Sequence, residues 1–282
     1  PNPVTVLEPG VFNAPGAVNN PGSSTVTGFG TTVGYSDIES VDIAAATAAP
    51  SEYTIDAAGI GGNGLGNGTA DGFRLIMGPE GDNVSVFLNG AFSQSIPLDG
   101  LNRITIAGSN DGDTLTVDAT RGLINLPGGV VFNGGSGANQ LVLSGGEGLE
   151  TEMYDPGAGV DLMAGTSGSA QSITFTGVQS VLSTVPAATL IVSGASSADT
   201  IEYLQGTSAE KGLVTMDSYP PIEFNNKAML NINGGPGSDT ITLNNPSTPT
   251  GLLDIVVNGP TINHLPTLGD IGDPSPISIN AG

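Results

Sequence analysis

The sequence lacks cysteine and tryptophan altogether, and its one histidine is His264. The absence of cysteine excludes disulfide bonds, thiolate catalysis and cysteine-ligated zinc. With a single histidine, no metal site can be built from several imidazoles, and a Ser-His-Asp triad has His264 as its one available base. The sequence also has no run of the ~20 apolar residues that a membrane-spanning helix requires, so we expect no direct membrane insertion.

Positive charge is almost as scarce. The 282 residues include 5 Lys plus Arg against 27 Asp plus Glu, which gives a formal net charge of -22. A surface of this charge repels the phosphates of nucleic acids and anionic lipid headgroups, so we expect no nucleic-acid partner. It attracts divalent cations, which makes Ca2+ the one cofactor that the charge favours. Hydrophobic residues are nevertheless 38% of the chain, enough to build a core.

The sequence is rich in glycine, proline and short alternating runs of Val, Ile, Leu, Thr and Phe. It contains 44 Gly and 20 Pro, roughly twice the average usage of these two residues. Gly, Asn and Asp separate the apolar runs, a pattern typical of short strands connected by turns. We therefore predict an all-β fold.

One corner motif recurs along the chain. Its formula is U-x-U-x-G-x4-[DN]-x-U-x-U, where U is an apolar residue. The motif occurs at 104–117, 130–143, 190–203 and 230–243, and more loosely at 75–86. Strand side chains alternate between two faces, so the apolar residues of each arm share one face. We expect Ile106, Phe132, Val192 and Ile232 in a core, with a left-handed glycine at the corner.

The Asp or Asn that opens the second arm of each motif is the candidate site residue. Asp113, Asn139, Asp199 and Asp239 occupy this position, and Asp111 precedes the first of them by two residues. Asp and Asn side chains accept hydrogen bonds from turn amides, so we interpret these residues as corner caps. The alternative is that they ligate calcium, which takes about six to eight oxygen ligands.

The order of the motifs is itself repeated, which indicates an imperfect tandem duplication. The segment DTLTVDATRGLINLPGGVVFNGG at 113–135 parallels DTITLNNPSTPTGLLDIVVNG at 239–259. Internal repeats favour stacked units, so we predict a parallel β-helix or β-solenoid. The alternative is two tandem β-sandwich domains. The expected parts are a Pro- and Gly-rich extended arm or linker at 1–30, solenoid halves at 31–150 and 151–263, and a linker or tail at 264–282.

The nonapeptide GGPGSDTIT, from Gly234 to Thr242, matches the calcium-loop pattern G-G-x-G-x-D-x-U-x. On this motif, and on the order of strand, Gly-Asp corner and IEF-N segment at 189–259, the chain resembles large repetitive bacterial extracellular and cell-surface proteins with haemolysin-type repeats. The resemblance implies a β-helical or β-roll fold and a location at the bacterial cell surface or in a secreted matrix. The nonapeptides of those proteins follow one another without interruption, whereas here they are single, so stacked calcium loops are not carried over.

These features favour a structural role. We expect an extracellular building block of a bacterial surface layer, filament or adhesin stalk, which self-associates through β edges into a homopolymer or joins neighbouring domains. Because the chain opens Pro1-Asn2-Pro3, we expect it to be a piece of a longer protein. A calcium-dependent adhesion or glycan-binding module is the second hypothesis.

The third hypothesis is a β-helix enzyme that acts on polysaccharides. Arg103 or Arg121 beside Asp111 and Asp113 would supply its base and carboxylates. The scarcity of cations disfavours a groove for an anionic polymer. We therefore expect no enzymatic activity.

Overall fold

The computed structural model describes residues 51–56, 69–166 and 168–259 in full, and the backbone of six further strands outside these ranges. The chain divides into two compact units, Pro1–Pro50 and Ser51–Gly282. In the first unit, β1 (Val4–Glu8) is parallel to β4 (Val41–Ala45), and β2 (Ser24–Gly28) is antiparallel to β3 (Thr31–Tyr35). The strands β1 and β2 fall within residues 1–30, where we expect an extended arm.

The second unit contains two large β-sheets, so the fold is all-β as the sequence predicts. The 11-stranded sheet has the order β24-β22-β18-β19-β20-β16-β12-β10-β6-β7-β8. The 10-stranded sheet has the order β25-β23-β21-β17-β13-β14-β15-β11-β9-β5. The described residues contain one helical element, the 3-10 helix η1 (Ala119–Arg121). None of their helices has the length and apolar character needed to cross a bilayer.

The strands of the 11-stranded sheet are β6 (Gly72–Met77), β7 (Asn83–Leu88), β8 (Ala91–Pro97), β10 (Thr114–Asp118), β12 (Gln140–Ser144), β16 (Ser180–Ser183), β18 (Thr200–Gln205), β19 (Gly212–Met216), β20 (Ile222–Phe224), β22 (Thr240–Asn244) and β24 (Thr261–His264). Those of the 10-stranded sheet are β5 (Glu52–Asp56), β9 (Arg103–Ala107), β11 (Val130–Asn133), β13 (Leu149–Asp155), β14 (Val160–Ala164), β15 (Ala170–Thr176), β17 (Ala187–Ser193), β21 (Lys227–Asn233), β23 (Asp254–Asn258) and β25 (Ile277–Asn280).

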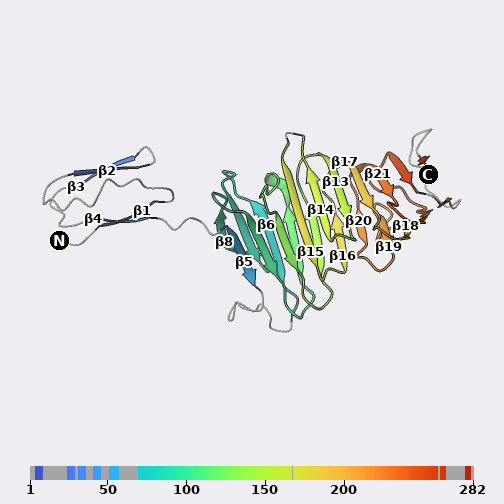
Figure 1. The fold of residues 1–282 in the computed structure, drawn as a ribbon, viewed down its shortest axis with the longest axis horizontal. Coiled ribbons are helices and arrows are strands. Elements are labelled where there is room, and N and C mark those ends of the chain that lie inside the picture. The colour runs from blue at the N-terminus through green and yellow to red at the C-terminus, as the bar shows by residue number, and fades with distance from the viewer. Residues whose placement is uncertain are drawn as a thin grey trace. The chain divides into compact units, whose positions relative to one another are not determined.

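The chain passes back and forth between the two sheets. From β9 to β13, and again from β20 to β25, each strand lies in the sheet opposite to the strand before it. We call one passage through both sheets a circuit. Strands of successive circuits pair in parallel, as β9 does with β11 and β10 with β12. In Figure 1 the strands of this unit accordingly progress from β5 and β8 toward β21 as the chain advances.

Three antiparallel hairpin insertions interrupt this pattern: β6-β7-β8, β13-β14-β15 and β18-β19-β20. They account for the unequal spacing of the corner motifs. The N–H of Asp113 donates to its counterpart Asn139, which lies 26 residues further along the chain because the circuit between them contains no hairpin. Asp199 meets Asp239 40 residues later, because that circuit includes β19 and β20. The corner formula did not predict these insertions.

The inward side chains of both sheets form one buried cluster. Ile106, Phe132 and Ile232 are fully buried and Val192 is nearly so, which confirms the faces predicted from alternation. Both sheets continue across residues 150 and 151, where we expect the two halves to meet. The strand β12 pairs with β16 across this boundary, and β11 pairs in parallel with β15.

Replacing Phe132 with alanine tests this core, because its ring is fully buried between the sheets. Buried Phe-to-Ala changes cost about 3–5 kcal/mol, and we expect a loss of this size in the free energy of unfolding. Val131→Ala, on the outward face of the same strand, is the control, with an expected loss of about 1 kcal/mol or less. Urea unfolding followed by circular dichroism measures both. Equal losses would contradict the inward placement of Phe132.

Candidate functional site

A ladder of side-chain oxygens runs along the corners that lead into the 11-stranded sheet. Asp71, Asp113, Asn139 and Gln179 each stand immediately before a strand of this sheet. The backbone N–H of Asp71 donates to Asp113 Oδ1 at 3.0 Å, and that of Asp113 donates to Asn139 Oδ1 at 2.7 Å. The N–H of Asn139 donates to Gln179 Oε1 at 2.5 Å. Each corner therefore supplies the acceptor for the corner of the preceding circuit.

The ladder residues also accept or donate hydrogen bonds within their own corners. Asp113 Oδ2 accepts from Ser109 N at 2.6 Å and from Ser109 Oγ at 3.2 Å. Asn139 Nδ2 donates to Ser136 O at 3.3 Å and, in the next circuit, to Gly177 O at 2.8 Å. Both side chains are buried, so these bonds satisfy backbone groups that water does not reach.

Asp199 and Asp239 form a second stretch of the same kind. Asp199 N donates to Asp239 Oδ1 at 3.0 Å, and Asp199 Oδ2 accepts from Ala195 N at 2.8 Å. Asp199 Oδ1 and Asp239 Oδ2 are buried, and no N–H or O–H of the described residues donates to them. Burial raises the pKa of Asp199; the Ala195 N–H opposes this shift, and the charges of Asp217 and Asp239 add to it. We call the six residues of the two stretches the corner ladder.

The structure brings the predicted site residues together in two separate pairs. Asp113 adjoins Asn139 and Asp199 adjoins Asp239, while β16, β20 and β19 lie between β12 and β18 in the sheet. Asp111 lies in the Asp113 corner, where its N–H donates to Ser109 Oγ at 3.1 Å. Across the described ranges, no three or more His, Cys, Asp or Glu side chains are grouped so as to hold a metal ion. Calcium binding therefore stays a prediction.

The glycine of the corner motif reflects the close approach of neighbouring circuits. A Cβ built on Gly108 would collide with Gly134 O, and one on Gly194 would collide with Gly234 O. We expected this glycine to be left-handed. In two of the four corners a positive φ falls instead on the following residue, with φ of 81° at Gly135 and 79° at Gly235. Packing between circuits thus explains the glycine at Gly108 and Gly194, whereas a Cβ on Gly134 or Gly234 would meet the Asn139 or Asp239 side chain of its own corner.

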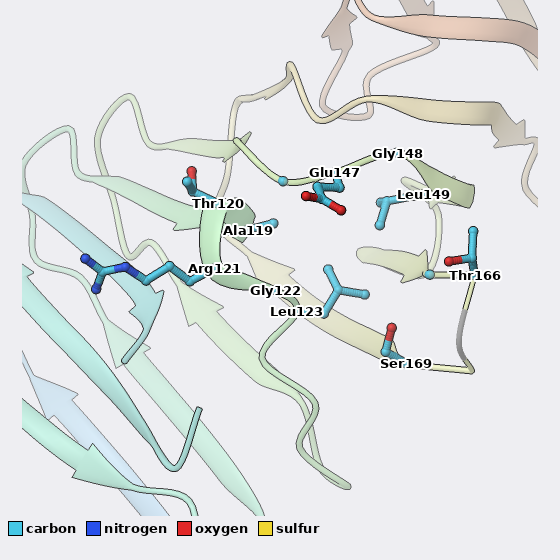
Figure 2. A pocket seen from close by; sticks show the side chains of 12 residues that line it. Ala119, Thr120, Arg121, Gly122, Leu123, Glu147, Gly148, Leu149, Thr166 and Ser169 are labelled. Carbon is cyan, nitrogen blue, oxygen red and sulfur yellow. The ribbon is translucent and has the colours of Figure 1, made fainter. Parts of the chain in front are cut away.

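A cavity of about 290 Å³ lies beside η1. It is lined by Ala119, Thr120, Arg121, Gly122, Leu123, Gly146, Glu147, Gly148, Leu149, Gly165, Thr166 and Ser169. Figure 2 shows Glu147, Leu149 and Leu123 around one space, whereas the guanidinium of Arg121 points away from it. Of the described residues that line the cavity, Arg121 and Glu147 are the ionisable ones. The cavity therefore lacks a facing pair of acid and base for general acid–base catalysis.

The other residues considered for catalysis lie in different places. Arg103 pairs with Glu52 at 3.4 Å, and its Nε donates to Gly128 O at 3.3 Å. His264 ends β24, and its side chain is outside the described part of the chain.

Sequence reasoning missed a cluster of charged groups buried between the sheets. The side chains of Lys227, at the start of β21, and Glu152, on β13, are both 0% exposed. Lys227 Nζ donates to Glu152 Oε2 at 2.5 Å, to Ser183 Oγ at 2.9 Å and to Val185 O. Ser183 Oγ in turn donates to Glu152 Oε2 at 2.9 Å. The ammonium thus has three acceptors, which a buried charge requires.

Asp161, on β14, completes this cluster. It is fully buried, and its carboxyl lies within hydrogen-bonding reach of Glu152. Neither oxygen of Asp161, nor Glu152 Oε1, accepts a hydrogen bond from an N–H or O–H of the described residues. Burial raises the pKa of Asp161 well above its ordinary value; the charge of Glu152 adds to this shift, and that of Lys227 opposes it. A proton on Asp161 that is shared with Glu152 satisfies both carboxyls. We call Lys227, Glu152, Asp161 and Ser183 the buried lysine cluster.

Asp113→Ala tests whether the corner ladder acts as a cap. The change leaves the N–H groups of Asp71 and Ser109 without their acceptor. A buried donor without a partner costs about 1–3 kcal/mol, so we expect the free energy of unfolding to fall by at least that amount, in calcium and in a calcium chelator alike. Asp111→Ala, in the same corner, is the control, with an expected loss below about 1 kcal/mol. Chemical denaturation measures both, and a loss confined to calcium-containing buffer would identify Asp113 as a metal ligand instead.

Asp199→Asn tests the electrostatics of the second stretch. Because the pKa of Asp199 is raised, its contribution to stability is fully present below the unfolded pKa and is lost as the pH rises through the folded pKa. Asparagine keeps an acceptor for Ala195 N and removes the charge. We therefore expect the variant to gain about 0.5 kcal/mol over the wild type at neutral pH and nothing at acid pH.

Asp99→Asn, at an exposed turn, is the matched control and should show no such difference. Calcium is a second readout of the same experiment. If the ion binds between Asp199 and Asp239, adding calcium will stabilise the wild type and not Asp199→Asn, which would reverse the order of the two at neutral pH.

Comparison with known proteins gives no independent indication of the site's role. The chain matches no protein-family model, no curated protein and no solved structure.

Proposed function

We propose that the two large sheets of the second unit form a β-solenoid with three hairpin insertions, and that the protein is a structural building block of a bacterial surface layer, filament or adhesin stalk. The solenoid is supported by strands that alternate between two sheets and pair in parallel with their counterparts in the next circuit. The corner ladder supports it too, because equivalent corner residues of successive circuits stack on one another. Continuity of both sheets across residues 150 and 151 favours this architecture over two tandem sandwiches.

The observation that carries the structural role is a sheet edge that no strand of the described residues covers. In the described part of the chain, β8 ends the 11-stranded sheet and has one hydrogen-bonded neighbour, β7. Natural edge strands are commonly protected by charged residues, proline or bulges. The strand β8 has the sequence AFSQSIP, without any charge, its one proline is the last residue, and its register with β7 shifts once, between Phe92 and Gln94. Such an edge favours pairing with a strand of another molecule.

The side chains at this edge are suited to an interface. Phe92, on β8, is 60% exposed and packs edge-on against Phe87, with 5.7 Å between the ring centroids. The guanidinium of Arg74 lies 5.1 Å from the centre of the Phe87 ring and pairs with Asp118 at 2.6 Å. Aromatic and arginine side chains are enriched in protein–protein interfaces. We therefore propose that subunits associate through this end of the solenoid.

An extracellular location on a bacterium is part of the proposal. A net charge of -22 and the absence of cysteine are compatible with secretion. The net charge also keeps separate subunits soluble before they associate. The resemblance to haemolysin-type repeat proteins points to the same location.

A calcium-dependent adhesion or glycan-binding module is the second candidate. A hollow of about 410 Å³, next to the corner of Asp199, is lined in part by Tyr219 and Asp155. An aromatic ring beside a carboxylate is one arrangement that holds a sugar ring by stacking and hydrogen bonding. Isothermal titration with calcium, followed by a glycan array, separates this module from an inert scaffold.

Phe92→Lys tests the edge as the assembly surface. A lysine on an edge strand opposes pairing, so we expect the concentration for half-maximal self-association to rise by about tenfold or more, the equivalent of ~1.4 kcal/mol. Leu253→Lys is the matched control, because Leu253 is 61% exposed but lies outside the strands. Sedimentation velocity over a concentration series measures both variants. A wild-type chain that stays monomeric at every concentration, with and without calcium, would refute the filament proposal.

A further inference from the structure

The buried lysine cluster places an amine and two carboxyl groups together in the protein interior. Lys227 Nζ lies 2.5 Å from Glu152 Oε2, and the Asp161 carboxyl lies within hydrogen-bonding reach of Glu152. All three side chains are 0% exposed. The three residues come from β21, β13 and β14, so the compartment is assembled only in the folded chain.

The register of the strands explains how these groups meet. Asp161 stands opposite Tyr154 in the β13-β14 pair, which makes Glu152 its diagonal neighbour on the same face. Lys227 stands opposite Ala187 in the β17-β21 pair. Its Nζ reaches Glu152 on β13, which lies beyond β17 in the sheet. Tyr154, the residue opposite Asp161, is buried and stacks on Phe175 with 6.0 Å between the ring centroids.

We infer that Lys227 and Asp161 condense into an intramolecular amide, with Glu152 as the group that moves the protons. The roles follow from the positions. Glu152 touches both other groups, so it is placed between the amine and the second carboxyl. Asp161 has no donor among the described residues that would hold it as a carboxylate. A neutral carboxyl is the better electrophile, and the direction of the pKa of Asp161 agrees with this assignment.

The step balances without any other reactant. Lys227 Nζ gives one proton to the Glu152 carboxylate and becomes a neutral amine. Its lone pair attacks Cγ of the protonated Asp161 carboxyl, and a C–N bond forms. A second proton passes from the nitrogen, by way of Glu152, to the hydroxyl of the tetrahedral intermediate, whose C–O bond breaks to release one water. The products are an amide, a water molecule and a protonated Glu152.

Two physical features favour the forward direction. The compartment starts with an ammonium and a carboxylate in an apolar interior, and it ends with neutral groups, so the cost of burying both charges disappears. Folding also fixes the amine and the carboxyls in proximity, which replaces a bimolecular encounter with an intramolecular one. The resulting cross-link would join β14 to β21 across β13 and β17. This inference does not depend on the role proposed above.

Mass spectrometry of the denatured full-length chain tests the inference. We expect the wild type to be lighter than its sequence by one water molecule, and Lys227→Met to have its full sequence mass. Lys211→Met is the matched control, because Lys211 forms an ion pair with Glu223 at 3.3 Å in a more exposed place. This variant should keep the loss of water. A wild type of full sequence mass overturns the inference.

Peptide mapping then identifies the bond. Asp-Gly sequences such as Asp111-Gly112 also lose water by forming a succinimide, so the mass alone is insufficient. A protease digest should yield one branched peptide in which the side chain of Lys227 carries that of Asp161. A branch from Lys227 to Glu152 overturns the assignment of roles.

Glu152→Gln keeps both reacting groups and removes the base. We expect this variant to fold, as judged by circular dichroism, and to retain its full sequence mass after purification. A folded Glu152→Gln chain that condenses as fast as the wild type overturns the role of Glu152. Lys227→Met is judged by the same spectrum, so that loss of the cross-link is distinguished from loss of the fold.

Discussion

The backbone amides at the corners depend on side-chain oxygens from the neighbouring circuit. Within a sheet each strand satisfies the next, but at a corner backbone bonds between circuits, such as that from Ser136 N to Ser109 O, leave some buried N–H groups without a backbone acceptor. Asp113 and Asn139 supply the missing acceptors, and they do so from the same position in the motif. The glycines at points of close approach, such as Gly108, allow neighbouring corners to lie near enough for these bonds.

The buried lysine cluster shows the opposite use of polar groups. The chain has 5 cations, and one of them, Lys227, lies in the interior with no exposed surface. Replacing a buried ion pair by apolar residues often preserves or raises stability, so the burial of Lys227 with Glu152 is weak evidence of a stabilising role. The condensation inferred above would give this cluster a chemical role.

Alternation of apolar residues was sufficient to predict the strand faces, as the burial of Ile106 and Phe132 shows. The corner residues were predictable as well, because Gly and Asp recur at fixed offsets. The hairpin insertions were not, since an antiparallel strand such as β14 alternates in the same way as a parallel one. The buried lysine cluster was not predictable either. Lys227, Glu152 and Asp161 come from three strands, and the sequence offers one weak signal, the inward parity that Asp161 shares with Met163.

The positions of the three hairpins determine how evenly the two sheets grow. Each insertion adds two strands to one sheet, or ~10 Å of height at the usual strand spacing, and none to the other. The insertion at β14 adds two strands to the 10-stranded sheet, and the next one, at β19, adds two strands to the 11-stranded sheet. The insertion at β19 therefore offsets the difference in strand number that the insertion at β14 creates. Two successive hairpins in the same sheet would instead leave the two sheets with unequal numbers of strands. The unit would then bend toward the sheet that has fewer strands.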